Sequence, residues 1–86
     1  MNTTLLNDVI QDIKYELARA LKHGEQFSSM HEAYGVILEE VDEFWELTRL
    51  KKRDRKAEDI HDELVQISAM AIKGLLSIEH FVGGNI

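Results

Sequence analysis

The sequence of 86 residues contains no cysteine and no proline. Without cysteine, neither a disulfide nor a thiolate metal site can stabilise the fold. Without proline, nothing in the chain interrupts a long helix, and residues that favour helices, such as Ala, Leu, Glu and Lys, are abundant. We therefore predict an all-α protein that forms a single domain over residues 1–86.

Long apolar runs and an excess of basic residues are also missing. The 16 acidic residues outnumber the 10 basic residues, and the formal net charge is −6. This charge disfavours a protein whose main task is to bind the phosphate backbone of a nucleic acid. The N-terminal residues lack the pattern of a secretory signal, and no apolar run approaches the length of a transmembrane helix. We expect a cytoplasmic protein with neither a nucleic acid nor a membrane as its partner.

Apolar residues at helical spacing predict three main helices, over roughly residues 4–22, 30–50 and 57–80. Gly24 is predicted to end the first helix. Ser29, followed three residues later by Glu32, has the sequence of a capping box for the second helix. The third helix is apolar around most of its circumference, a surface wider than two short neighbouring helices can cover. We therefore expect a helical bundle completed by oligomerisation, as a homodimer or a homotetramer.

The segment EEVDEFWEL in the second predicted helix carries five acidic residues, which separate into two groups on a helical wheel. Glu39, Asp42 and Glu46 lie opposite the apolar arc, whereas Glu40 and Glu43 lie inside it. Burial of an ionised carboxylate costs several kcal/mol. Glu40 and Glu43 therefore need a cation or a proton, unless they reach water at the edge of the arc.

Asp59 and Asp62 form a second carboxylate pair with the same three-residue spacing. They begin a narrow polar stripe on the third predicted helix, which is either its solvated face or the wall of a polar cavity. If the second and third helices run antiparallel, the two pairs can converge. Carboxylate oxygens are ligands that suit Mg²⁺, with Mn²⁺ as a substitute.

Three segments together resemble a known family. The segments LKHGEQFSS, HEAYGVILEEVDEFWEL and EDIHDELVQISAMAIKGL resemble the MazG-like, all-α nucleoside triphosphate pyrophosphohydrolases over roughly residues 15–75. The family pattern is E-E-x-x-E followed, after a variable gap, by E-x-x-D. Glu39, Glu40 and Glu43 fill the first part. When Asp62 is taken as the final aspartate, the second part departs from the pattern, because Asp59 stands where glutamate is usual.

The resemblance implies a hydrolase that requires Mg²⁺ and cleaves a ribo- or deoxyribonucleoside triphosphate to the monophosphate and pyrophosphate. It also implies assembly into dimers or dimers of dimers. The catalytic set carried over is Glu39, Glu40 and Glu43, with Glu39 orienting the attacking water or accepting its proton. The metal ligands carried over are Glu40, Glu43, Asp59 and Asp62.

The substrate also needs groups that contact its phosphates and its base. The candidate phosphate-binding residues are Lys73, Lys56 and Arg53. The candidate base-binding residues are His23, Phe27, His31 and Trp45. For the basic run 51–56 the competing interpretation is a solvated turn, and for the base-binding candidates it is an ordinary core or surface position.

Two other functions stay open at this point. A phosphoribosyl-ATP pyrophosphatase has a similar helical architecture and acidic motif. A non-enzymatic helical dimer that acts as an interaction module would use the carboxylates only for solubility. Binding of divalent cations separates the enzymes from the interaction module, and the choice of substrate separates the two enzymes.

Overall fold

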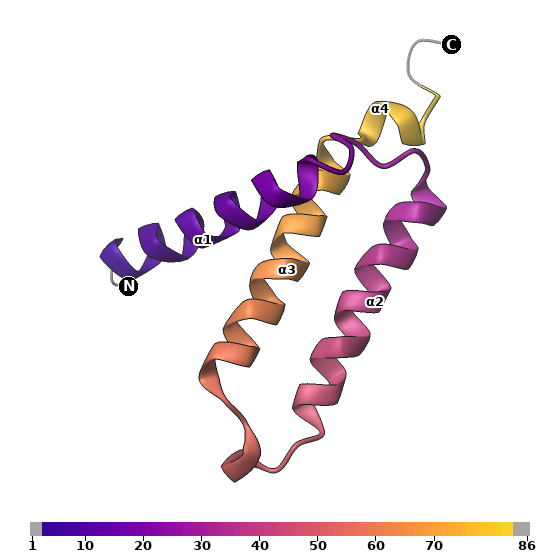
Figure 1. The fold of residues 1–86 in the computed structure, drawn as a ribbon. Helices are drawn as coiled ribbons and strands as arrows, with labels where there is room; N and C mark the ends of the chain where they lie inside the picture. Colours follow the sequence, from indigo (N-terminus) through magenta and orange to yellow (C-terminus); the bar gives the residue numbers. More distant parts are fainter. Residues whose placement is uncertain (1–2, 84–86) are drawn as a thin grey trace.

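The computed structural model describes residues 3–83 and is all-α over that range (Figure 1). Its elements are α1 (Thr3–Leu21), α2 (Met30–Thr48), the 3-10 helix η1 (Lys52–Asp54), α3 (Ala57–Leu75) and the single turn α4 (Ile78–Phe81). Helices α2 and α3 run antiparallel, and α1 runs obliquely across α3 (Figure 1). Both α1 and α2 pack on α3. The predicted all-α class with three main helices is confirmed.

The start of α2 follows the predicted capping box with one difference. The Ser29 hydroxyl accepts the Glu32 backbone N–H at 3.1 Å, as a capping serine does. The Glu32 carboxylate accepts hydrogen bonds from the backbone N–H and the hydroxyl of Ser28, each at 3.1 Å, and not from the N–H of Ser29. The preceding loop leaves α1 through Gly24, whose φ of 128° suits a residue without a side chain. Local sequence therefore sets both ends of this loop.

The third helix ends at Leu75, whereas the sequence predicts a helix that continues to residue 80. The cause is Ser77, whose side chain is fully buried. Its hydroxyl donates to the Lys73 carbonyl at 2.7 Å and accepts the Phe27 backbone N–H at 2.8 Å. Gln26 Nε2 adds a bond to the Leu76 carbonyl at 2.8 Å. At the end of α3 the Leu76 carbonyl and the Ser77 hydroxyl thus bond to the α1–α2 loop, while the Lys73 carbonyl accepts the Ser77 hydroxyl.

The buried core lies at the end of the molecule where this loop meets the C-terminal part of α3. It consists of Phe27, Ala33, Ala69 and Met70. Partly buried apolar residues from α1, α2 and α4 pack against it, namely Leu17, Ala20, Val36, Ile37 and Phe81. Toward the other end of α2 and α3, polar and charged residues lie between the helices together with apolar ones. The acidic residues described below lie in that part of the contact.

We predict that Ser77→Ala destabilises the protein by about 1–3 kcal/mol, because it leaves the buried Phe27 N–H without an acceptor. Ser68→Ala is the matched control, since the Ser68 hydroxyl bonds only to the Leu64 carbonyl one turn earlier in the same helix. This variant should change the free energy of unfolding by no more than about 0.5 kcal/mol. Urea unfolding measures both variants. Equal destabilisation of the two would contradict the role given to Ser77.

Candidate metal centre

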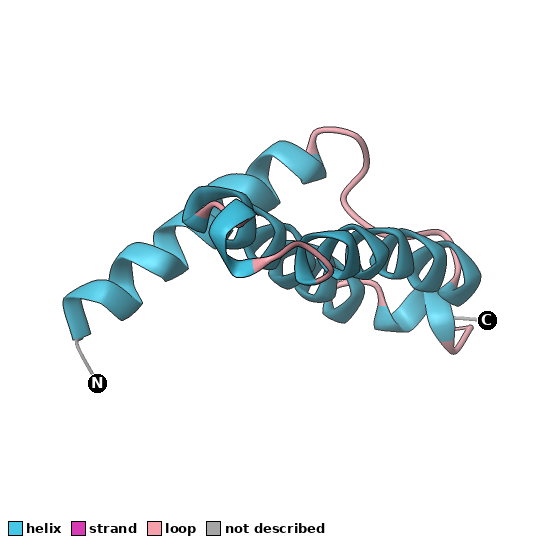
Figure 2. Ribbon diagram, turned by 90° about the horizontal axis from the view of Figure 1, so that it is seen from below, coloured by secondary structure: helices cyan, strands magenta, loops and turns pink. Residues whose placement is uncertain are grey.

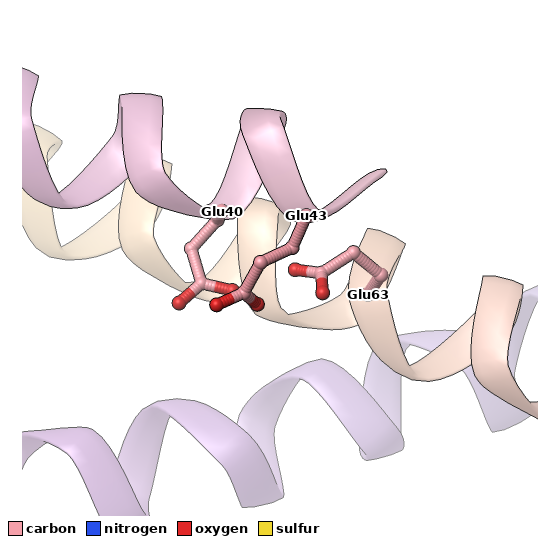
Figure 3. A group of neighbouring side chains, drawn as sticks. All are labelled: Glu40, Glu43 and Glu63. Carbon is pink, nitrogen blue, oxygen red and sulfur yellow. The ribbon is translucent and has the colours of Figure 1, made fainter. Parts of the chain in front are cut away.

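Three glutamates converge between α2 and α3. Glu40 and Glu43 project from α2, Glu63 projects from α3, and their carboxylates point toward one another (Figure 3). One carboxylate oxygen from each residue lies within 4.8 Å of the others. Within residues 3–83 this is the group of three or more metal-ligating side chains that comes this close together. We call Glu40, Glu43 and Glu63 the acidic cluster.

The apolar spacing of the two helices positions the acidic cluster. On α3, Glu63 follows Ile60 by three residues and precedes Ile67 by four, so it shares the helix face that packs on α2. On α2, Glu40 lies three residues after Ile37 and four before Phe44, both partly buried. Each acid therefore replaces an apolar residue in a packed stripe. Packing of the stripes brings the carboxylates together.

Glu63 has an altered acidity in this position. Burial raises the pKa of Glu63 from 4.5 to about 8, and hydrogen bonds of its protonated form to Glu40 and Glu43 contribute to the increase. Repulsion from the charges of those two residues acts in the same direction. Among the described residues, the buried Glu63 Oε2 has no hydrogen-bond partner. At neutral pH the acidic cluster therefore retains a proton unless a cation neutralises it.

The donor set fits a divalent cation with a preference for oxygen ligands. Mg²⁺ binds oxygen at about 2.0–2.1 Å, so two oxygens bound to one ion lie about 3–4 Å apart. The three carboxylate oxygens already lie within 4.8 Å of one another, which is only slightly more than this separation. A bound cation would supply a partner to Glu63 Oε2 and would remove the repulsion that raises the pKa. Glu40, Glu43 and Glu63 would hold it.

The structure brings together some of the predicted ligands and separates others. Glu40 and Glu43 lie side by side as predicted, and Glu63 lies opposite them. Asp59 and Asp62 are exposed and lie outside the acidic cluster. Asp62 instead lines a cleft between α1 and α3, close to His61, whose Nε2 lies 2.9 Å from Asp12 Oδ2. Glu39 is exposed on α2 and is likewise outside the cluster.

Sequence reasoning missed Glu63, although two signals point to it. The first is its place among isoleucines on the apolar face of α3, the same signal that singled out Glu40 on α2. The second is the E-x-x-D pattern, whose glutamate can be Glu63 if Gln66 takes the aspartate position. Gln66 Nε2 donates to Glu16 Oε1 at 2.8 Å, which ties α3 to α1. In this register the final acid of the pattern, its aspartate, is replaced by the amide of Gln66.

The candidate phosphate-binding residues lie at both ends of α3. Lys73 Nζ stands 4.6 Å from the centre of the Phe27 ring, a cation–π contact. Lys73 follows Glu63 by ten residues, which corresponds to about 15 Å along the helix. Lys56 precedes α3, Arg53 belongs to η1, and both are exposed. Lys56 is about 10 Å from Glu63 along the axis, so it is the closer of the two lysines.

The four candidate base-binding residues have different surroundings. Phe27 is only 2% exposed and belongs to the core. His23 and His31 are exposed. Trp45 is 57% exposed and lies on the outer surface of α2. These residues do not form one slot in a single chain, since Phe27 is packed in the interior while Trp45 faces outward.

In comparisons with known proteins, no family model, no curated protein and no solved structure matches this chain. Among the described residues, no helix has both the length and the apolar character needed to cross a membrane.

In the absence of divalent cations, we predict that the protein loses stability as the pH rises from about 5 to about 8. The folded state holds a proton on Glu63 that the unfolded chain has already released over this range. Raising the pH therefore favours unfolding. The Glu63→Gln variant has no titrating group at this position, so its free energy of unfolding should depend less on pH. Urea unfolding in EDTA at several pH values measures both proteins, and identical pH profiles would refute this prediction.

Proposed function

We propose that the protein is a nucleoside triphosphate pyrophosphohydrolase that requires Mg²⁺ and releases pyrophosphate and the nucleoside monophosphate. The observation that supports the proposal is the convergence of Glu40 and Glu43 from α2 with Glu63 from α3 within 4.8 Å. A pair of acidic helices of this kind is what the resemblance to the MazG-like family implies. The proposal assigns the metal to the acidic cluster and no longer requires Asp59 or Asp62 as ligands in the same chain.

The charge of the site explains why a cation is needed. A nucleoside triphosphate and three carboxylates repel each other strongly at short range unless positive charge lies between them. When bound, Mg²⁺ would polarise the α-phosphate, activate a water molecule and neutralise the departing pyrophosphate. The protein contributes by holding its carboxylates in place through the packed stripes of α2 and α3.

Two further roles are assigned to residues near the acidic cluster. Glu39 precedes Glu40 and is exposed, so its carboxylate is free of the packed interface and suits the acceptor of a proton from the attacking water. Lys56 and Arg53 lie at the η1 end of α3 and suit contacts with the outer phosphates. Lys73 is the weaker candidate because its ammonium group packs on the Phe27 ring.

Gln66 gives the proposed site a distinctive feature. Relative to the family pattern, Gln66 replaces the final aspartate with a neutral amide, so the three carboxylates of the acidic cluster remain as protein ligands. The site therefore carries less negative charge and leaves more metal positions for water or substrate oxygens, which Mg²⁺ commonly retains. The phosphoribosyl-ATP pyrophosphatase alternative uses similar chemistry, and substrate tests distinguish it.

We predict that Mg²⁺ or Mn²⁺ raises the thermal unfolding temperature of the wild-type protein by several degrees. A ligand that binds only the folded state adds about 1.4 kcal/mol at ten times its dissociation constant. Glu63→Gln should abolish this shift, whereas Glu46→Gln should preserve it, since Glu46 pairs with Arg49 on the solvent side of α2. Scanning calorimetry measures the shift. An unchanged wild-type transition would favour the non-enzymatic interaction module.

We also predict Mg²⁺-dependent release of pyrophosphate, rather than of single phosphate, from at least one nucleoside triphosphate. Glu40→Gln, Glu43→Gln and Glu63→Gln should each lower kcat by about 100-fold or more, and Glu46→Gln should have little effect. The substrates are the common ribo- and deoxyribonucleoside triphosphates, with phosphoribosyl-ATP as a separate test. Circular dichroism establishes that each variant is folded. Full activity of the Glu63→Gln variant would remove Glu63 from the site.

A further inference from the structure

A cleft lies between α1 and α3, beside the acidic cluster. Its volume is about 430 Å³, which is within the range of small-molecule sites in proteins. Helix α1 extends away from the other helices toward its N-terminus (Figure 2). We call this cavity the α1–α3 cleft. Polar side chains from both helices line it, among them Asp12, Tyr15, Glu16 and Arg19 from α1 and Asp62 and Gln66 from α3.

The α1–α3 cleft and the acidic cluster lie along the same edge of α3. Gln66 follows Glu63 by one turn, which is about 4.5 Å along the axis. On a helical wheel, Gln66 and Asp62 lie about 60° and 100° from Glu63, both in the same direction. Figure 3 shows the carboxylates of the acidic cluster directed toward the side on which α1 runs. A ligand that contacts a cation at the acidic cluster can therefore extend into the cleft.

Hydrogen bonds between α1 and α3 hold most polar groups of the cleft in place. The Glu16 side chain is only 16% exposed and pairs with Arg19 Nη1 at 3.1 Å. Its other carboxylate oxygen accepts Gln66 Nε2 at 2.8 Å. Asp12 Oδ2 lies 2.9 Å from His61 Nε2. These contacts fix the shape of the cleft before any ligand binds.

Other groups of the cleft are free to contact a ligand. Within residues 3–83, the Asp62 carboxylate makes no ion pair and no hydrogen bond. Tyr15 is 71% exposed, so its ring offers a face on which a flat ligand can stack. Arg19 has N–H groups beyond the one that pairs with Glu16. The cleft thus provides a carboxylate acceptor, a guanidinium donor and an aromatic face.

We propose that the α1–α3 cleft holds the base of the nucleoside triphosphate and that Asp62 selects guanine. The pairing edge of guanine places a ring N–H beside an amino group, and a carboxylate accepts both in two parallel hydrogen bonds. The adjacent carbonyl oxygen of guanine suits Arg19, and its ring stacks on Tyr15. A phosphate does not suit this cleft, because the carboxylates of Asp12, Glu16 and Asp62 outnumber the one guanidinium.

This proposal rests on the proposed function, because a cation at the acidic cluster would fix the α-phosphate next to the cleft. The outer phosphates then extend toward Lys56 and Arg53, which precede Glu63 along the chain. Gln66 lies on the other side of Glu63, toward the cleft. The triphosphate and the base therefore occupy different parts of the α3 surface, and the acidic cluster lies between them.

The first test compares guanosine triphosphate (GTP) with inosine triphosphate (ITP), which lacks only the amino group of guanine. Wild-type protein should have a kcat/KM for GTP about 10-fold or more above that for ITP, because ITP loses a hydrogen bond to a charged group. Asp62→Asn should lose this preference. Asp42→Asn is the matched control and should keep it, since Asp42 is exposed on α2. Equal use of GTP and ITP by the wild-type protein would overturn the proposal.

The two tyrosines of the chain provide a second matched pair. Tyr15→Ala should raise the KM for GTP about 10-fold or more and change kcat little, because stacking of the base is lost equally from the bound substrate and the transition state. Tyr34 is 67% exposed on α2, and Tyr34→Ala should leave both constants unchanged. A fall in kcat without a rise in KM for Tyr15→Ala would contradict a contact with the base.

A binding measurement separates failure of this proposal from failure of the proposed function. Guanosine monophosphate (GMP) in EDTA presents the base without a cation, so it tests the cleft even if no triphosphate is cleaved. Millimolar GMP should shift the amide NMR signals of Tyr15, Asp62 and Gln66 more than inosine monophosphate does. These shifts without any release of pyrophosphate would contradict the proposed function alone. Shifts centred on α2, or no shifts at these three residues, would overturn the proposal for the cleft.

Discussion

The contact between α2 and α3 is the interaction on which the rest of the structure depends. Its apolar residues hold the two helices antiparallel, and the same contact places Glu40 and Glu63 on facing stripes. A leucine at position 63 would pack there without an electrostatic cost. The glutamate instead has a pKa of about 8 and a buried oxygen without a hydrogen-bond partner among the described residues. Such a group is costly in a small domain and is consistent with a function that requires it.

The free-energy cost of placing Glu63 at the α2–α3 contact is important because the domain is small. A small domain is marginally stable. A protonated or ion-bound carboxylate at its central contact therefore affects a large fraction of its total free energy of unfolding. The hydrogen bonds of Ser77 and Gln26 compensate at the opposite end of α3 by tying the α1–α2 loop to the helix terminus. The pairs Gln66–Glu16 and His61–Asp12 attach α1 along the other side of α3. Stability is thus concentrated around α3, and α2 and α3 leave an apolar side exposed.

The sequence was sufficient for the features that depend on local chemistry. Helical spacing predicts three helices, and Ser29 with Glu32 predicts the start of α2. The position of Glu40 and Glu43 within an apolar arc predicts that they share one side of α2 and leaves open whether they reach water; Glu40 is partly buried there, and Glu43 is exposed. The break at Ser77 could not be read locally, because it depends on a hydrogen bond from Phe27, fifty residues earlier in the chain. The burial of Phe27 likewise depends on residues distant in the chain, Ala69 and Met70, which form the core with it.

The acidic residues of α3 show a second limit. Asp59 and Asp62 repeat the spacing of the first pair and form a polar stripe, and this pattern favours them as ligands. Spacing alone does not show which stripe of α3 faces α2, and the apolar residues Ile60 and Ile67 determine that Glu63 does. An acid within an apolar stripe is therefore a better indicator of the residues that face the neighbouring helix than the spacing of an acidic pair. The same holds on α2. The base-binding candidates are distributed between core and surface, which spacing could not reveal.

The most direct test of the central claim is paramagnetic broadening of amide NMR signals by Mn²⁺ at low molar ratio. Mn²⁺ held by Glu40, Glu43 and Glu63 should first broaden the signals of residues around these three positions on α2 and α3. Mg²⁺ in excess should restore them, and Glu63→Gln should abolish the effect. Broadening centred on Asp59, Asp62 and the α1–α3 cleft, or spread evenly over the acidic surface, would contradict the account.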